Sequence, residues 1–182
     1  DQLNISPKLS TYAILDQLII RSATNKSVIE HLRNYNRFLA SWLPHSTSEQ
    51  ESIGHLGESS GMLPNTLANR LSFCNNVNDG AYKGNSFAVS LPCGLLNSQD
   101  PIPLSSRWGI GGCSISLMLS PDVNALYSNN ASLTGLTNAH YELRNVKLIA
   151  ELMTPAPDEL SRLMNQTSGT MEYNAISSYY TS

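Results

Sequence analysis

The strongest pattern along the chain is an alternation of apolar and mostly polar side chains from Cys113 to Ser120. The apolar side of this stretch holds Cys113, Ile115, Leu117 and Leu119. The other side holds Ser114, Ser116, Met118 and Ser120. A two-residue period places alternate side chains on opposite faces of an extended chain. The pattern therefore predicts a strand with one face in a core and one face that tolerates water.

A second alternation runs from His140 to Met153. Its wholly apolar side holds Val146, Leu148, Ala150 and Leu152. Its mixed side holds Lys147, Ile149, Glu151 and Met153. We predict a long strand here, which Thr154, Pro155 and Pro157 would end because proline cannot continue a ladder of hydrogen bonds.

Other apolar runs predict further strands. These are Thr11 to Ser22, Phe87 to Leu91, Arg70 to Cys74, and a last run over residues 170–181 that stops in mid-pattern before Ser182. The pair Asp79-Gly80 favours a hairpin turn. After Phe87–Leu91, the prolines at 101 and 103 and the glycines at 109, 111 and 112 favour a corner in the chain over a central strand.

Helical signals are fewer. Ser27 followed by Glu30 matches a capping box and predicts a helix from Ser27 to about Trp42, which Pro44 would end. The apolar stripe of this helix consists of Val28, Leu32, Tyr35, Leu39 and Trp42. One helical turn is expected between Pro121 and Tyr127. A short helix capped by Asp158 would carry Leu160, Leu163 and Met164 and stop at Gly169.

Strands separated by long polar loops, at 44–69 and 128–138, dominate this pattern, and helices do not alternate regularly with strands. This order is typical of an all-β fold and not of a doubly wound α/β fold. We expect a β-sandwich with one or two inserted short helices, built as one domain over residues 1–182.

Composition narrows the function. Only 14% of the 182 residues are charged, and the net charge of −3 comes without any cluster of Lys and Arg. The electrostatic signature of nucleic-acid binding is therefore missing from this segment. No apolar run approaches the roughly 20 residues that span a bilayer. The chain begins at Asp1 and not at methionine, so an upstream segment is expected.

Candidate chemistry is sparse. Cys74, Cys93 and Cys113 are odd in number and lack a CxxC spacing, which indicates free thiols in a core and neither a disulfide framework nor a zinc site. The four histidines, at 31, 45, 55 and 140, never pair at helical spacing. We expect no metal, no cofactor and no catalytic residue. Four glycosylation sequons begin at Asn4, Asn25, Asn130 and Asn165, and we assign no glycan to them.

One motif matches a nucleophile elbow. Gly57 to Gly61 reads G-x-S-x-G, with Ser59 at the position of a hydrolase nucleophile. Acids at 79, 100 and 122 and then His140 follow in hydrolase order, but the buried strand and the helix that should flank the serine are missing. Glu49, Glu51 and Glu58 read as solvated charges in the same loop. We interpret the match as coincidence.

Three segments together resemble the jelly-roll capsid proteins of icosahedral viruses, in particular the double-jelly-roll major capsid proteins of DNA viruses and their relatives. They are YAILDQLIIRSATNKSVIEHLRNYNRF at 12–38, FAVSLPCGLLNSQDPIPLSSRWGIGGCSISLMLS at 87–120, and YELRNVKLIAELMTP at 141–155. They stand in the family's order and cover about half of the chain. The first resembles the family's opening strand, turn and "IE-x-x-x-N-Y" helix, and the second resembles its "LP-x-G … IPL … strand" corner.

The resemblance implies a wedge of two four-stranded sheets, assembly into capsomers and no catalysis. A chain of 182 residues supplies one such domain, either a single-jelly-roll vertex or penton protein or one half of a double jelly roll. We therefore expect a viral structural protein located in the virion. It would associate with its own copies, as trimers or pentamers, and with other capsid proteins.

Two alternatives remain open. A carbohydrate-binding or adhesive β-sandwich would need exposed aromatic platforms, and Tyr127, Tyr179 and Tyr180 are the candidates. A serine hydrolase that uses Ser59 is the least favoured.

Overall fold

A computed structural model of the chain describes residues 2–5, 9–46, 48, 75–76, 86–98, 101–105, 109–128, 140–166, 173 and 177. The chain divides into two compact units. The first takes residues 1–17, 33–90 and 117–142, and the second takes 18–32, 91–116 and 143–182. Strands β2 and β5 each contribute residues to both units.

A small three-stranded sheet belongs to the first unit. Its strands are β4 (Asn75–Asn76), β1 (Gln2–Ile5) and β6 (Leu126–Ser128), in that order. Both pairings are antiparallel, with Leu3 opposite Asn75 on one side and opposite Ser128 on the other. The short helix α4 (Asp122–Ala125) leads directly into β6, which agrees with the helical turn expected after Pro121.

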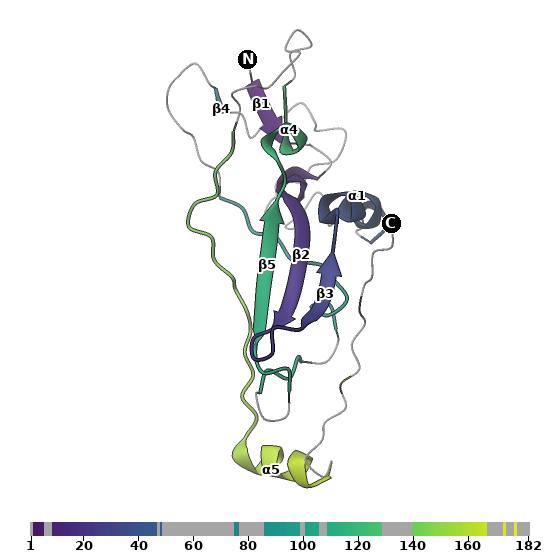
Figure 1. Ribbon diagram of the computed structural model, residues 1–182, viewed down its shortest axis with the longest axis vertical. Helices are drawn as coiled ribbons and strands as arrows, with labels where there is room; N and C mark the ends of the chain where they lie inside the picture. Colours follow the sequence, from purple (N-terminus) through teal and green to yellow (C-terminus); the bar gives the residue numbers. More distant parts are fainter. Residues whose placement is uncertain are drawn as a thin grey trace. The chain divides into compact units, whose positions relative to one another are not determined.

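The larger sheet has the order β3-β2-β5, with β2 at Leu15–Ser22, β3 at Val28–Leu32 and β5 at Cys113–Leu119. Figure 1 shows the three arrows alternating in direction. β2 pairs with β3 in antiparallel register, from Leu18 opposite Leu32 to Arg21 opposite Val28. The register shifts between Ile20 and Arg21, because Ile20 faces Glu30 while Arg21 faces Val28, so that Ile29 forms a β-bulge.

The helix predicted from Ser27 to Trp42 is wrong in its first half. Residues Val28–Leu32 form strand β3, and helix α1 begins only at Tyr35 and continues to Ser46 with Pro44 inside it. The Ser27 hydroxyl donates to Asn25 Oδ1 at 2.7 Å and caps no helix. Asn34, at φ 51°, separates the strand from the helix. Pairing with β2 outweighs a local capping signal because it satisfies the backbone along the whole segment.

Helix α1 covers the core of the first unit with one face. Tyr35, Leu39 and Leu43 recur every four residues and are all buried. The rings of Tyr35 and Phe38 stack with their centroids 6.3 Å apart, and those of Phe38 and Trp42 stack at 6.2 Å. The predicted stripe is confirmed at Tyr35 and Leu39, while Trp42 lies at its half-exposed edge.

Two other strand predictions are wrong. Residues 87–91 and 140–153 are not in strands, and the expected strand from Thr11 starts with a 3-10 helix, η1 (Ser10–Ile14), before β2. Side-chain alternation defines which way residues would face, but a strand exists only when a neighbouring strand pairs with it. β5 has β2 beside it and is a strand as predicted, but Leu117 and Leu119, which were expected on its core face, are 38% and 46% exposed.

The short helix near the end is confirmed as α5 (Pro157–Gln166), which begins one residue before the expected cap at Asp158. Several predictions fall outside the described residues. These are the loops over 49–69 and 129–138, the strand at Arg70–Cys74, the Asp79-Gly80 turn, Gly169, and most of the last run, of which only Tyr173 and Ser177 are described.

In its described part the chain is mostly β in type, with antiparallel sheets and a few helices. Helices α1, α4 and α5 with η1 exceed the one or two helices that we expected. Within the described residues, none of the helices has both the length and the apolar character needed to cross a bilayer.

Candidate functional site

A buried carboxylate in the second unit joins strand β3 to the loop that contains Gly94 and Leu95. Glu30, on β3, is only 2% exposed. Its Oε1 accepts a hydrogen bond from the Gly94 backbone N–H at 3.0 Å, and its Oε2 accepts one from the Leu95 N–H at 2.9 Å. Bonds to an ionised acceptor are among the stronger hydrogen bonds in proteins, and they offset the cost of removing the carboxylate from water. Glu30 therefore fixes a loop that lies more than sixty residues away in sequence.

The loop that Glu30 holds is a compact turn. Asn97 N–H donates to the Cys93 carbonyl at 3.0 Å and Ser98 N–H donates to the Leu95 carbonyl at 3.2 Å. Cys93 and Leu95 are both buried. Burial, with the carboxylate of Glu30 as a further cause, raises the pKa of the Cys93 thiol from 9.0 to about 12. Burial therefore favours the protonated, neutral form of the thiol at physiological pH.

Ser120 is a second buried junction, in the first unit. Its hydroxyl donates to the Ala13 carbonyl at 3.0 Å and accepts from Asn36 Nδ2 at 3.1 Å, and its N–H donates to the Ile14 carbonyl at 2.8 Å. The Tyr141 hydroxyl donates to the Ser120 carbonyl. Ser120 therefore joins four separate stretches of chain at one point.

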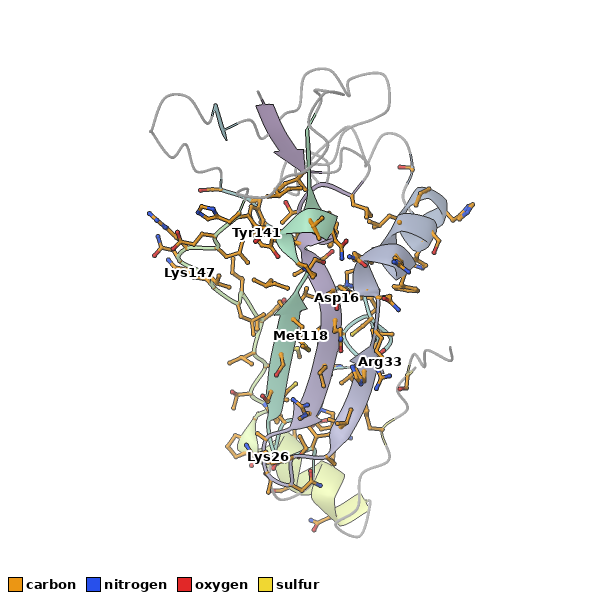
Figure 2. The ribbon with its side chains drawn as sticks, turned by 45° about the horizontal axis from the view of Figure 1, so that its top comes forward. Asp16, Lys26, Arg33, Met118, Tyr141 and Lys147 are labelled. Atoms are coloured by element: carbon orange, nitrogen blue, oxygen red, sulfur yellow. The ribbon has the colours of Figure 1, made fainter. Side chains whose placement is uncertain are left out.

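Tyr141 is also held through its backbone. Its N–H donates to Asp122 Oδ1, in α4, at 3.3 Å. Burial raises the pKa of the Tyr141 hydroxyl, and the charge of Asp122 raises it further. Figure 2 labels Tyr141 beside α4. The side chain thus serves as a neutral hydrogen-bond donor.

A glycine turn packs against the connection between β2 and β3. Gly111 and Gly112 have φ values of 70° and 89°, in the left-handed region. Thr24 Oγ1 donates to the Gly111 carbonyl at 2.7 Å, and Ala23 N–H donates to the Gly112 carbonyl at 3.1 Å. A Cβ on Gly111 would lie 2.1 Å from Thr24 Oγ1. The glycines predicted a corner in the chain here. Position 111 requires glycine because its backbone is left-handed and because a Cβ would come too close to Thr24.

The candidates for catalysis are not assembled in the described part of the chain. Ser59 and the motif 57–61, the three loop glutamates, and the acids at 79 and 100 all lie outside it. Asp122 is described, and its carboxylate is bonded to Tyr141. Within the described residues no group of three His, Cys, Asp or Glu could hold a metal ion. His31 lies on β3, His45 in the last turn of α1 and His140 just before Tyr141, while His55 lies outside the description.

The remaining candidates are placed as follows. Cys93 and Cys113 are free thiols, the first buried and the second half-buried, and burial also raises the pKa of Cys113. Among the sequon asparagines, Asn25 and Asn165 are exposed. Tyr127 lies in β6. The positions of Cys74, Asn130, Tyr179 and Tyr180 are not described.

Large apolar side chains are exposed on two segments. On β5, the residues Leu117, Met118 and Leu119 are 38–49% exposed. After Asn145, the residues Val146, Leu148, Ile149, Leu152 and Met153 are between 69% and 92% exposed. Figure 2 labels Met118 and Lys147 on these segments. Exposed large apolar side chains that follow one another along a segment are candidates for contacts with another molecule, and each of the two segments is such a candidate by itself.

The signal for Glu30 was present in the sequence but was misread. Its position three residues after Ser27 matched a helix cap, while its place between Ile29 and Leu32 also fits a buried position on a strand. For Ser120, the alternation predicted the side exposed to water, and no local signal marked its burial.

Comparisons of the chain with protein-family models, with curated proteins and with solved structures give no match. A function is therefore inferred from the residues and their contacts.

Proposed function

We propose that the chain is a structural subunit of an icosahedral viral capsid, built on a jelly-roll β-sandwich and acting without catalysis. It works by associating with further copies of itself and with other capsid proteins in the virion. This fold needs two facing antiparallel sheets, and the antiparallel pairings of β1 with β4 and β6 and of β2 with β3 are of the kind that it uses, which supports the proposal.

The observation that carries the proposal is the junction at Ser120. The three segments that resemble capsid proteins meet there, because Ala13 and Asn36 belong to the first, Ser120 ends the second, and Tyr141 begins the third. Glu30 joins the first segment to the second again through Gly94 and Leu95. The three segments that resemble capsid proteins are therefore joined to one another by hydrogen bonds. This is expected if the three segments belong to one fold.

The surface supports an assembly role. The exposed apolar side chains of β5 lie on a sheet edge in the described part of the chain, since the order is β3-β2-β5. An unpaired edge with apolar side chains is a template for contacts with another chain. Contacts that are weak one by one become strong when symmetry repeats them around a closed shell.

Imaging and native mass measurement of the purified full chain test the proposal. We expect trimers, pentamers or closed particles. The variant Met118→Asp should reduce assembly at least severalfold, because it replaces an exposed apolar side chain of the edge strand with a charge. Ser114→Asp is the matched control, since Ser114 is exposed on the same side of the same strand, and it should assemble like the unchanged protein. A strictly monomeric chain under all conditions would contradict the proposal.

A further inference from the structure

The segment Val146–Met153 has a strand-ending residue on each side, and among the described residues no strand pairs with it. Asn145 has a φ of 55°, which ends any strand before Val146, and Pro155 ends one after Met153. The structure assigns no strand or helix to residues 146–153, and the large apolar side chains among them are 69–92% exposed. Five such side chains in eight residues leave apolar surface in water that burial would stabilise.

The charges of this segment indicate what covers it. Lys147 and Glu151 are exposed, and within the described residues neither side chain has a hydrogen bond or an ion pair. They lie two positions before and two positions after Ile149. If two copies of the segment run antiparallel with Ile149 opposite Ile149, each Lys147 faces Glu151 of the second copy.

Other registers lose this match. Centring the pair on Lys147 or on Glu151 places like charges opposite each other, and centring it on Leu148 or Ala150 leaves both charges facing other residue types. A parallel pair in register also opposes like charges. Opposite charges across a pair of strands stabilise it, and like charges destabilise it. Only the register centred on Ile149 pairs both charges favourably, and it also places Val146 opposite Leu152 and Leu148 opposite Ala150.

We propose that Val146–Met153 forms an antiparallel two-stranded ribbon with the same segment of a second copy of the chain, centred on Ile149. The strand predicted from the alternation of side chains then forms on association. The interface is isologous, because the same surface is used by both copies. A two-stranded ribbon alone is marginal in water, so this contact is weak unless it is repeated.

The inference rests on the proposed function only in requiring that copies associate. A ribbon pair could form in a protein that builds no shell, and a shell could form through other contacts. Particle imaging tests the shell and cross-linking tests the ribbon, so either can fail without the other.

Disulfide cross-linking of the full chain tests the register. Residues directly opposite each other have Cβ atoms about 5 Å apart, which is near the range of a disulfide. Ile149→Cys should therefore give covalent dimers on mild oxidation. In Val146→Cys the two cysteines would lie about 20 Å apart along the ribbon, so this variant, although well exposed, should not dimerise by itself. Mixed with Leu152→Cys, it should form a heterodimer.

The unchanged chain, run in parallel, gives the background from its three native cysteines. Equal dimer yields from Ile149→Cys and Val146→Cys would overturn the inference, because they would show no preferred register. Absence of dimers from Ile149→Cys would overturn it too. All three positions are well exposed, so the substitutions should leave the fold intact.

Charge reversal gives an independent test by sedimentation equilibrium. Lys147→Glu and Glu151→Lys should each weaken self-association by about tenfold, because two attractive pairs in the dimer become repulsive. The double variant exchanges the charges and should return to the affinity of the unchanged chain. A double variant as weak as the single variants would contradict the pairing.

Discussion

At the scale of single residues, buried polar groups hold distant segments together. Glu30 and Ser120 are 2% and 4% exposed, and each contacts backbone far away in sequence. Leaving a buried polar group without a hydrogen-bond partner destabilises the folded state by more than a formed hydrogen bond stabilises it. Substitutions at these positions are therefore expected to lower stability. Cys93 is buried as well and lies in the loop to which Glu30 is hydrogen-bonded.

Replacing Glu30 should destabilise the fold. Glu30→Ala leaves the N–H groups of Gly94 and Leu95 without their acceptors, and we expect a loss of about 2–4 kcal/mol in the free energy of unfolding, measured by urea denaturation. Glu30→Gln keeps one acceptor and should lose less. Glu159→Gln is the control, because its carboxylate is exposed and its ion pair with Arg162, one turn along α5, lies on the surface. A loss below that of the control would contradict the role given to Glu30.

The Cys93 thiol predicts a dependence of stability on pH. Its pKa is raised from 9.0 to about 12 in the folded chain, so the unfolded chain loses this proton first as pH rises. Stability from this group is complete below pH 9 and declines between pH 9 and about 12. Urea denaturation at pH 8 and pH 10 should show the decline, and Cys93→Ala should make it shallower. An unchanged slope in that variant would argue against Cys93 as the cause.

At the scale of elements, pairing decided between competing local signals. Val28–Leu32 carries a helix-capping pattern but lies beside β2, and it is a strand. Cys113–Leu119 and residues 146–153 have similar alternation, yet only the first lies beside another described strand. Turns between elements contribute as well, since the carbonyls of Gly111 and Gly112 accept hydrogen bonds from the turn that follows β2.

Gly111→Ala should destabilise the protein by about 1–3 kcal/mol for its left-handed backbone alone, with a further cost for the contact with Thr24 Oγ1. Thermal denaturation of a double-mutant cycle separates the two causes. Adding Thr24→Ala to Gly111→Ala removes the contact with Thr24 Oγ1 and should recover that part of the loss, while the backbone strain and the contact with the Cβ of residue 24, at 2.8 Å, remain. If Gly111→Ala unfolds at the same temperature as the unchanged protein, the turn does not depend on glycine at this position.

At the scale of the whole molecule, the three segments that resemble capsid proteins are held by shared contacts within each compact unit. In the first unit Ser120 bonds to Ala13, Asn36 and Tyr141, and in the second Glu30 bonds to Gly94 and Leu95. The apolar side chains left exposed on β5 and on Val146–Met153 are the surfaces on which the proposed contacts between chains depend. The assembly, cross-linking and charge-reversal experiments described above belong to this scale.

By itself the sequence determined what depends on local periodicity and turn chemistry: the strand at β5, the helical turn after Pro121, the short helix α5 and the glycine corner. Tertiary structure decided what depends on a partner remote in sequence. β2 made a strand of Val28–Leu32, a distant loop gave Glu30 its role, and Ser120 is buried by contacts with three other stretches of chain. The physical reason is that strand pairing and burial of polar groups are contacts between remote segments, which no local pattern encodes.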